Sequence, residues 1–183
     1  MRSQRIYWIT TIAFLSILVP WLTCNGAEIT LNDTPVRVCF SPNGGCAKAI
    51  VYEINNAKSQ ILVQAYSFTS KPIAKALLAA HKRGVKVEVI IDKNQLLEKY
   101  NSATFLANSG LPVFMDGDHA IAHDKIMIID GKTVVTGSFN FTNAAEYKNA
   151  ENLLIIKSDE LAKIYTSNWN KHLEHSIPFG PRY

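Results

Sequence analysis

The chain has 183 residues and a formal charge of +4, with 19% charged and 48% apolar residues. This length is enough for one domain with a buried core, and the composition excludes a disordered chain, a collagen-like repeat and a long coiled coil. The small positive charge permits an anionic partner but does not require one.

The start of the chain has the pattern of a secretory signal. Arg2 and Arg5 precede an apolar run over residues 6–19, and small or polar residues follow it. The run is shorter than the roughly 20 residues that a membrane-spanning helix needs, so an uncleaved anchor is the alternative. We therefore expect a signal over residues 1–26, a mature domain over 27–183, and a periplasmic or secreted location.

The mature domain keeps two cysteines, Cys39 and Cys46, which flank a turn-rich loop. In an oxidising compartment, a disulfide between them would close this loop. If the protein stays reduced, two buried thiols are the alternative.

Strand-like and helix-like segments alternate along the mature domain. Strands are expected over residues 35–40, 60–68, 85–92, 111–115 and 152–156, and helices over residues 45–58, 71–83, 94–108 and 159–174. An irregular polar loop is expected just before the last strand. The alternation predicts a single α/β domain, in which helices flank a mixed sheet on both faces.

A hairpin is predicted between the fourth and the last of these strands, because Asp130-Gly131 separates two apolar runs. With those two residues as the turn, Lys125 would lie opposite Thr136, and His123 would lie opposite Ser138. Opposed side chains in an antiparallel pair project from the same face. The polar ends of the two runs would therefore gather on one face, near the open end of the hairpin.

The polar cluster so predicted comprises His123, Lys125, Ser138 and Asn140. Histidine can be a nucleophile or a general acid near neutral pH, lysine supplies a positive charge, and Ser and Asn supply hydrogen-bond donors. Such a set suits the charged oxygens of a phosphodiester. Asp130 sits in the turn, away from the cluster, and is expected to shape and cap that turn.

A nucleophilic imidazole works better when a carboxylate holds its other ring nitrogen. Glu151 directly precedes the last apolar strand and is our candidate for this partner. Glu146 lies in the polar loop and is expected to be solvated. Tyr66 and Phe68 are expected to belong to the core.

The motif His123-x-Lys125-x4-Asp130-x6-Gly137-Ser138, with Asn140 after it, resembles the complete signature of the phospholipase D superfamily. The segments 64–68, 83–87 and 151–152 strengthen the resemblance, which spans roughly residues 36–169. The chain resembles the short bacterial members that carry one motif. These are the Nuc-type endonucleases and the small secreted phospholipase D-like proteins of rickettsiae, and the Cys39 and Cys46 pair is more like the latter.

The resemblance implies the phospholipase D/nuclease fold and a two-step mechanism without a metal or other cofactor. His123 would attack phosphorus to form a phosphohistidine, a second histidine would protonate the leaving oxygen, and water would release the product. Lys125, Ser138 and Asn140 would bind the phosphate oxygens, and Glu151 would orient His123. Asp130 belongs to the same catalytic signature.

The mechanism needs two histidines, yet the signature occurs once. We therefore expect a homodimer with the active site at the subunit interface. The alternative is a monomer that borrows His119 or His81 as its acid. A metal site at His172 and His175, which have helical spacing, would need more ligands than the sequence shows.

The favoured function is an endonuclease on DNA or RNA, because the domain is small and basic. A phospholipase D acting on phosphatidylcholine-type lipids is the alternative, supported by the resemblance to secreted proteins. A nucleic-acid-binding module without turnover would show salt-sensitive binding that survives loss of His123. The completeness of the motif argues against such a module.

Overall fold

The computed structural model describes residues 26–97 and 101–180, so nearly all of the expected signal lies outside the described residues. Eight strands form one sheet in the order β1-β7-β6-β5-β2-β3-β4-β8. The strands are β1 (Val36–Ser41), β2 (Gln60–Ala65), β3 (Lys86–Asp92), β4 (Val113–Asp116), β5 (Lys125–Ile129), β6 (Thr133–Gly137), β7 (Glu151–Lys157) and β8 (Ile177–Pro178). The helices are α1 (Cys46–Asn56), α2 (Lys71–Lys82), α3 (Ser102–Asn108), α4 (Asn143–Tyr147) and α5 (Asp159–His175), with a short 3₁₀ helix, η1 (Lys93–Leu97).

The sheet is mixed, as predicted. Strands β2, β3 and β4 run parallel, whereas β5, β6, β7 and β1 pair antiparallel with their neighbours. The carboxyl ends of β2, β3, β4 and β6 therefore meet the amino ends of β5 and β7 at one edge of the sheet. We call this the active edge, since the predicted cluster lies there.

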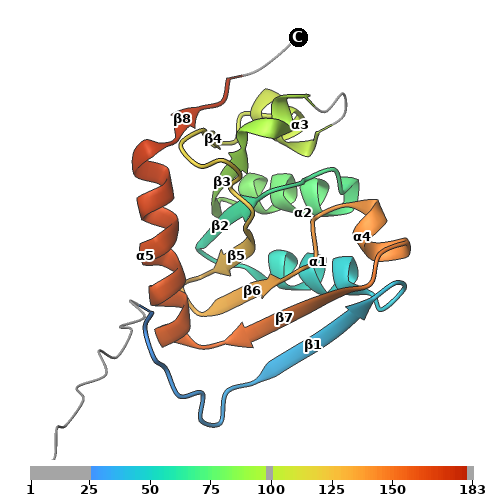
Figure 1. Cartoon of the computed structure of the whole chain (residues 1–183), viewed down its shortest axis with the longest axis vertical. Coiled ribbons are helices and arrows are strands. Elements are labelled where there is room, and N and C mark those ends of the chain that lie inside the picture. The colour runs from blue at the N-terminus through green and yellow to red at the C-terminus, as the bar shows by residue number, and fades with distance from the viewer. Residues whose placement is uncertain (1–25, 98–100, 181–183) are drawn as a thin grey trace, which may run out of the picture.

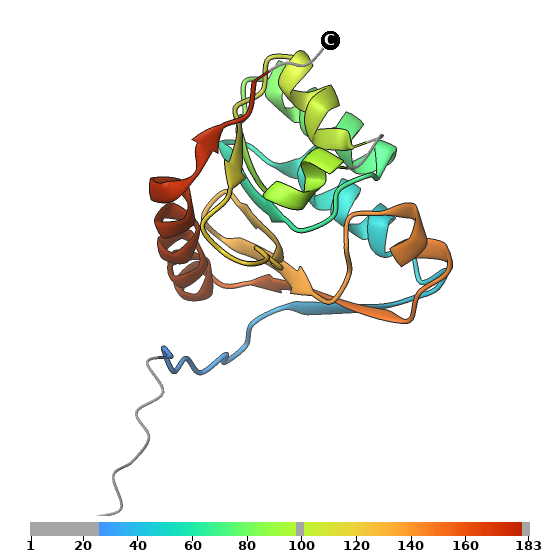
Figure 2. The same ribbon diagram turned by 45° about the horizontal axis from the view of Figure 1, so that its top comes forward.

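Helices cover both faces of the sheet, which confirms the expected architecture. Figures 1 and 2 show α5 on one side of the strands and α1, α2 and α3 on the other. The larger core lies beneath α1, α2 and α3, where Ile50, Leu77 and Leu106 are fully buried. On the other face Trp169 of α5 is 1% exposed, and its indole N–H donates to the carbonyl of Val63 at 2.9 Å.

Side-chain caps fix where several helices begin. Ser158 accepts a hydrogen bond from the backbone N–H of Leu161 at the start of α5. Asn101 accepts one from Thr104 at the start of α3. The single helix predicted over residues 94–108 is therefore wrong. Two short elements, η1 and α3, replace it, because the Asn101 cap begins a new helix.

The polar loop before β7 is also more ordered than predicted. Thr142 caps the short helix α4 by accepting a hydrogen bond from the N–H of Ala145. After α5 the chain turns back, and β8 pairs with β4. Among the described residues no helix has both the length and the apolar character needed to cross a membrane.

The hairpin forms where expected, but its register differs from the prediction by one residue. Asp130 and Gly131 both have positive φ, and the N–H of Lys132 donates to the carbonyl of Ile129, as in a tight turn. The ladder nevertheless pairs Ile129 with Thr133, so Lys132 is an extra residue between turn and strand. The predicted opposition of Lys125 to Thr136, and of His123 to Ser138, is therefore wrong.

Candidate active site

The candidate site forms at the active edge, where separate parts of the chain end or begin side by side. Lys125 is the first residue of β5, Ser138 directly follows β6, and Glu151 is the first residue of β7. His123 lies two residues before β5 and is exposed. The antiparallel order β7-β6-β5 thus gathers most of the predicted cluster, despite the shifted register.

His123 and Lys125 both contact Tyr66, which directly follows β2. The rings of Tyr66 and His123 are 4.5 Å apart between centroids. The ammonium of Lys125 lies 4.9 Å from the centroid of the Tyr66 ring and donates to the backbone carbonyl of His123 at 2.6 Å. Phe68 is fully buried, as predicted, but Tyr66 is half-buried and belongs to the site. This role of Tyr66 was not predicted, and the signal for it in the sequence is the position of Tyr66 at the end of a buried strand.

The ammonium of Lys125 is a buried positive charge, since the residue is only 7% exposed. Burial lowers the pKa of Lys125, and the nearby carboxylates of Asp124 and Glu151 oppose part of this shift. A partly desolvated ammonium interacts more strongly with an anion than a solvated one. Lys125 therefore suits the binding of a phosphate oxygen.

Ser138 and Glu151 are joined by a short hydrogen bond, in which the Ser138 hydroxyl donates to the Glu151 carboxylate at 2.6 Å. The amide of Asn149 donates to the other oxygen of that carboxylate at 2.9 Å. No hydrogen bond joins Glu151 to His123 among the described residues. Orientation of His123 by Glu151 therefore stays a prediction.

A β-bulge directs Ser138 toward β7. The N–H groups of Ser138 and Phe139 both donate to the carbonyl of Asn152, at 3.1 and 3.2 Å. Gly137 precedes the bulge with a φ of 143°, and a Cβ there would lie 2.3 Å from the Asn152 carbonyl oxygen. Glycine is thus required at this position, since any side chain would push the two strands apart.

Asn140 lies between two fully buried aromatic residues, Phe139 and Phe141. Its side-chain oxygen is buried and has no hydrogen-bond partner among the described residues. A buried polar atom without a partner is costly unless a ligand satisfies it. The Asn140 amide therefore has unused capacity for a substrate, and no hydrogen bond joins it to His123 or Lys125 in the described part of the chain.

Asp130 lies at the opposite end of β5 from Lys125 and takes no part in the cluster. Its carboxylate accepts hydrogen bonds from the backbone N–H groups of Lys58, Ser59 and Gln60. Burial alone would raise the pKa of Asp130, but these hydrogen bonds hold it below its ordinary value. Asp130 thus fastens the hairpin turn to the loop between α1 and β2. This agrees with the expectation that Asp130 shapes the turn, and it does not support a catalytic role for Asp130.

Glu146 is not solvated, contrary to the expectation from sequence. It is 7% exposed, and its two oxygens accept hydrogen bonds from the N–H groups of Gly45 and Ala47, at 3.0 and 2.8 Å. These N–H groups belong to the first turn of α1, where a negative charge is stabilising. Glu146 is therefore a helix cap supplied by α4, which sequence reasoning missed because the two helices are far apart in the chain.

Cys39 and Cys46 are neighbouring free thiols in this structure. Burial raises the pKa of the Cys46 thiol to about 11, and the nearby Cys39 and Glu146 add to the shift. The two thiols are close enough to interact.

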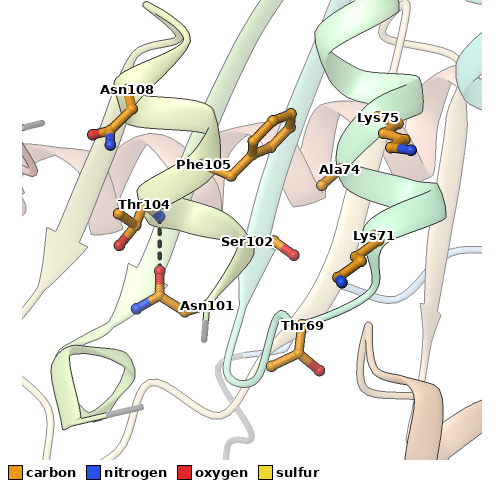
Figure 3. A pocket seen from close by; sticks show the side chains of 9 residues that line it. All are labelled: Thr69, Lys71, Ala74, Lys75, Asn101, Ser102, Thr104, Phe105 and Asn108. Carbon is orange, nitrogen blue, oxygen red and sulfur yellow. Dashed lines mark hydrogen bonds between the residues drawn. The ribbon is translucent and has the colours of Figure 1, made fainter. Parts of the chain in front are cut away.

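Two further features lie outside this cluster. A pocket of about 410 Å³ opens between α2 and α3 (Figure 3), with Lys71 and Lys75 on one side and Phe105 on the other. Thr69 also lines it, and the N–H of Thr69 donates to the carbonyl of Phe141, next to Asn140. Side chains that could bind a metal gather around Asp116, at the end of β4.

Comparison with known proteins agrees with this geometry. Residues 50–173 match the family model described as "Cardiolipin synthase, PLD-like domain". A phospholipase D from Rickettsia conorii is 43% identical over 139 residues, which cover 76% of this chain and 70% of that protein. The human mitochondrial cardiolipin hydrolase is 28% identical and covers 76% of this chain and 56% of its own length.

Among solved structures, Nuc from Salmonella typhimurium superimposes with a TM-score of 0.78 and 39% sequence identity. The match covers 81% of this chain and 99% of that one. The resemblance to single-motif bacterial members is thus confirmed at the level of both sequence and fold. The chain belongs to the phospholipase D superfamily and is a hydrolase of phosphodiester bonds.

Proposed function

We propose that the chain is an endonuclease that cleaves DNA or RNA through a phosphohistidine on His123, without a metal in the reaction. The observation that carries this proposal is the exposed His123 imidazole beside the buried ammonium of Lys125. An exposed nucleophile on an open sheet edge suits the backbone of a long polymer, which can lie across the surface.

In the first step a ring nitrogen of His123 attacks phosphorus, and the bond from phosphorus to the leaving oxygen breaks. Lys125 and the amide of Asn140 stabilise the charge on the non-bridging oxygens, with Ser138 assisting. A second histidine gives its proton to the leaving oxygen. Water then attacks phosphorus, the bond from phosphorus to nitrogen breaks, and the second histidine takes a proton back.

The second histidine is the His123 of another copy of this chain. An apolar surface that suits such a copy lies on β1, where Val36, Val38 and Phe40 are 45%, 51% and 66% exposed. These alternate residues share one face of the sheet. Helix α5 packs mainly across β2, β4, β5 and β6, so no helix within residues 26–97 and 101–180 packs mainly on this face of β1. Phe40 also pairs with Asn152, next to Glu151, and the apolar surface therefore borders the candidate site.

Hydrolysis of phospholipids is the second candidate, because the pocket between α2 and α3 could take an acyl chain (Figure 3). Thr69 in its lining donates a hydrogen bond to Phe141, the residue after Asn140. The relative named phospholipase D in Rickettsia conorii also supports this alternative. Cleavage of nucleic acid and of phospholipid uses the same chemistry at phosphorus. Contacts to the rest of the substrate, outside the phosphate, therefore determine which of the two is cleaved.

A parallel assay on plasmid DNA, single-stranded RNA and phosphatidylcholine vesicles tests the choice. We expect turnover of a nucleic acid, and turnover of the lipid alone would overturn the nuclease proposal. Phe105→Asp makes the pocket polar at a residue that is 42% exposed. It should leave nuclease activity unchanged, whereas a lipid-binding pocket would lose lipid turnover selectively.

We also propose that residues 1–26 direct export and that Cys39 and Cys46 form a disulfide outside the cytoplasm. The proximity of the two thiols supports this pairing. Mass spectrometry of the exported protein tests both points, because cleavage removes the start of the chain and a disulfide protects both cysteines from alkylation. An intact N-terminus or two alkylated cysteines would contradict the respective proposal.

A further inference from the structure

Four side chains that can ligate a metal converge at the carboxyl end of β4, and none of them belongs to the cluster of His123, Lys125, Ser138 and Glu151. Asp116 ends β4, His119 follows it by three residues, and His172 and His175 lie in the last turn of α5. One ligand atom from each residue lies within 4.8 Å of the other three. The two histidines of α5 share a helix face, since residues three apart are neighbours on a helix.

The carboxylate of Asp116 is at the centre of this group and is fully buried. It lies 2.7 Å from Nδ1 of His172, 3.1 Å from Nδ1 of His119 and 3.3 Å from Nε2 of His175. The three imidazole rings are also close to one another, with centroids 4.9 to 5.4 Å apart.

Hydrogen bonds within the group leave one of its nitrogen atoms without a partner. Nε2 of His175 is buried and makes no hydrogen bond among the described residues, although it is 3.3 Å from Asp116. A cation at the centre would use the nitrogen of His175 that hydrogen bonding leaves unpaired.

We propose that Asp116, His119, His172 and His175 bind one Zn²⁺ ion and thereby fasten the end of α5 to the segment that leads to His123. Three imidazole nitrogens and one carboxylate oxygen form a ligand set that zinc accepts in tetrahedral geometry. With bonds of about 2.0 Å, the ligand atoms of such a site are about 3.3 Å apart. Small rotations of the side chains would bring the present group to that spacing.

The position of the group assigns the ion a structural role. Four protein ligands complete a tetrahedral zinc site and leave no position for a substrate. Residues 117–124 form a segment that contains both His119 and His123. Hydrogen bonds already hold this segment in place at two points. The ammonium of Lys93 donates to the carbonyl of His119, and the N–H of Ala122 donates to Asp92. By binding His119 together with His172 and His175, zinc would attach the start of this segment to the end of α5.

Metal titration of the full chain tests the proposal. The chain is first freed of metal by chelation, and Co²⁺ and then Zn²⁺ are added. We expect one ion per chain by mass spectrometry of metals, with the visible bands of four-coordinate Co²⁺ disappearing as Zn²⁺ displaces it. At a hundredfold excess of Zn²⁺ over its dissociation constant, Tm should rise by about 5–10 °C.

Single-residue variants supply the control. His119→Gln and His172→Gln should abolish the Co²⁺ bands and the rise in Tm, while His81→Gln, on α2 and outside the group, should keep both. If the variants fail to fold, chemical modification of the wild-type histidines decides. Zn²⁺ should then protect His119, His172 and His175 from diethylpyrocarbonate but leave His81 reactive.

Two results would overturn the zinc site. One is the absence of stoichiometric binding to wild type, and the other is binding that His119→Gln and His172→Gln leave unchanged. Phosphodiester hydrolysis at low temperature should persist in the metal-free chain, because the ion takes no part in that chemistry. Failure of the proposed reaction and failure of the zinc site are therefore distinguishable.

Discussion

At the scale of single residues, His123 carries the covalent step in the proposed mechanism. His123→Asn should lower the rate of hydrolysis of a phosphodiester by at least about a thousandfold, as loss of a nucleophile does in other enzymes. Because His123 is exposed, the fold should remain intact. Rates should be measured together with circular dichroism and Tm. Substantial residual turnover in a folded variant would show that His123 is not the nucleophile.

Two glutamates close in sequence should respond in different ways to loss of charge. If Glu151 orients the imidazole of His123 during the reaction, as we propose, Glu151→Gln should reduce activity by about 10- to 100-fold. Glu146→Gln should instead lower the free energy of unfolding by about 0.5–2 kcal/mol, since Glu146 caps α1. Kinetics and urea denaturation of both variants separate the two roles. If Glu146→Gln stays stable but loses more activity than Glu151→Gln, then Glu146 and not Glu151 is the carboxylate that supports catalysis.

The sequence predicted which residues gather at the active edge better than it predicted the contacts that they make. His123, Lys125 and Ser138 stand in a short motif around a recognisable turn, so local pattern was enough to find them. Glu146, Tyr66 and the group around Asp116 depend on elements that meet only in the folded chain. Their roles could not be inferred from spacing, because each partner lies far away in sequence.

At the scale of elements, the hairpin of β5 and β6 depends on Asp130. Asp130→Asn should lower the free energy of unfolding by about 1–3 kcal/mol at pH 7, because a carboxylate that accepts three backbone hydrogen bonds is lost. Asn tolerates the positive φ at this position, so the turn itself should survive.

The effect of Asp130→Asn should also depend on pH. The pKa of Asp130 is lower in the folded chain than the unfolded value of about 3.9. Its stabilisation is therefore present above pH 4 and is lost as pH falls through the folded pKa. Urea denaturation at several pH values should show the gap to wild type shrinking in acid, with the exposed Glu28→Gln as a control. A gap that does not change with pH would contradict a role for the charge.

Element boundaries followed from sequence where a local signal fixed them. The Asp130-Gly131 turn and Gly84 after α2 gave the hairpin and the helix end correctly. The register of the hairpin did not follow, because the Asp130-Gly131 turn signal does not reveal that Lys132 is an extra residue between the turn and β6. The break between η1 and α3 was missed for a related reason, since the cap at Asn101 outweighs an apolar pattern that continues across it.

At the scale of the whole molecule, two chains should share each active site. When wild type is mixed with excess His123→Asn chains under exchange conditions, activity per wild-type chain should fall as heterodimers form. Each mixed site then lacks one of its two histidines. Native mass spectrometry confirms the heterodimers, and constant activity in their presence would refute the shared site.

The apolar surface of β1 should hold the two copies together. Phe40→Asp should shift the protein toward monomer in sedimentation velocity and reduce activity in parallel, because it buries a charge in the proposed interface. Tyr52→Asp is the matched control, since Tyr52 is a 55% exposed aromatic residue on α1, on the other side of the sheet. A dimer that persists in Phe40→Asp would mean that another surface forms the contact.

The exposure of a single His123 on each chain has a consequence for when the enzyme works. If only the dimer is active, the reaction rate at high dilution rises with the square of the chain concentration. Monomers that rarely meet one another then have almost no activity. A long anion or a membrane that gathers chains on its surface would act as both substrate and activator. Specific activity measured over a dilution series, with and without such a surface, should show this threshold and its removal.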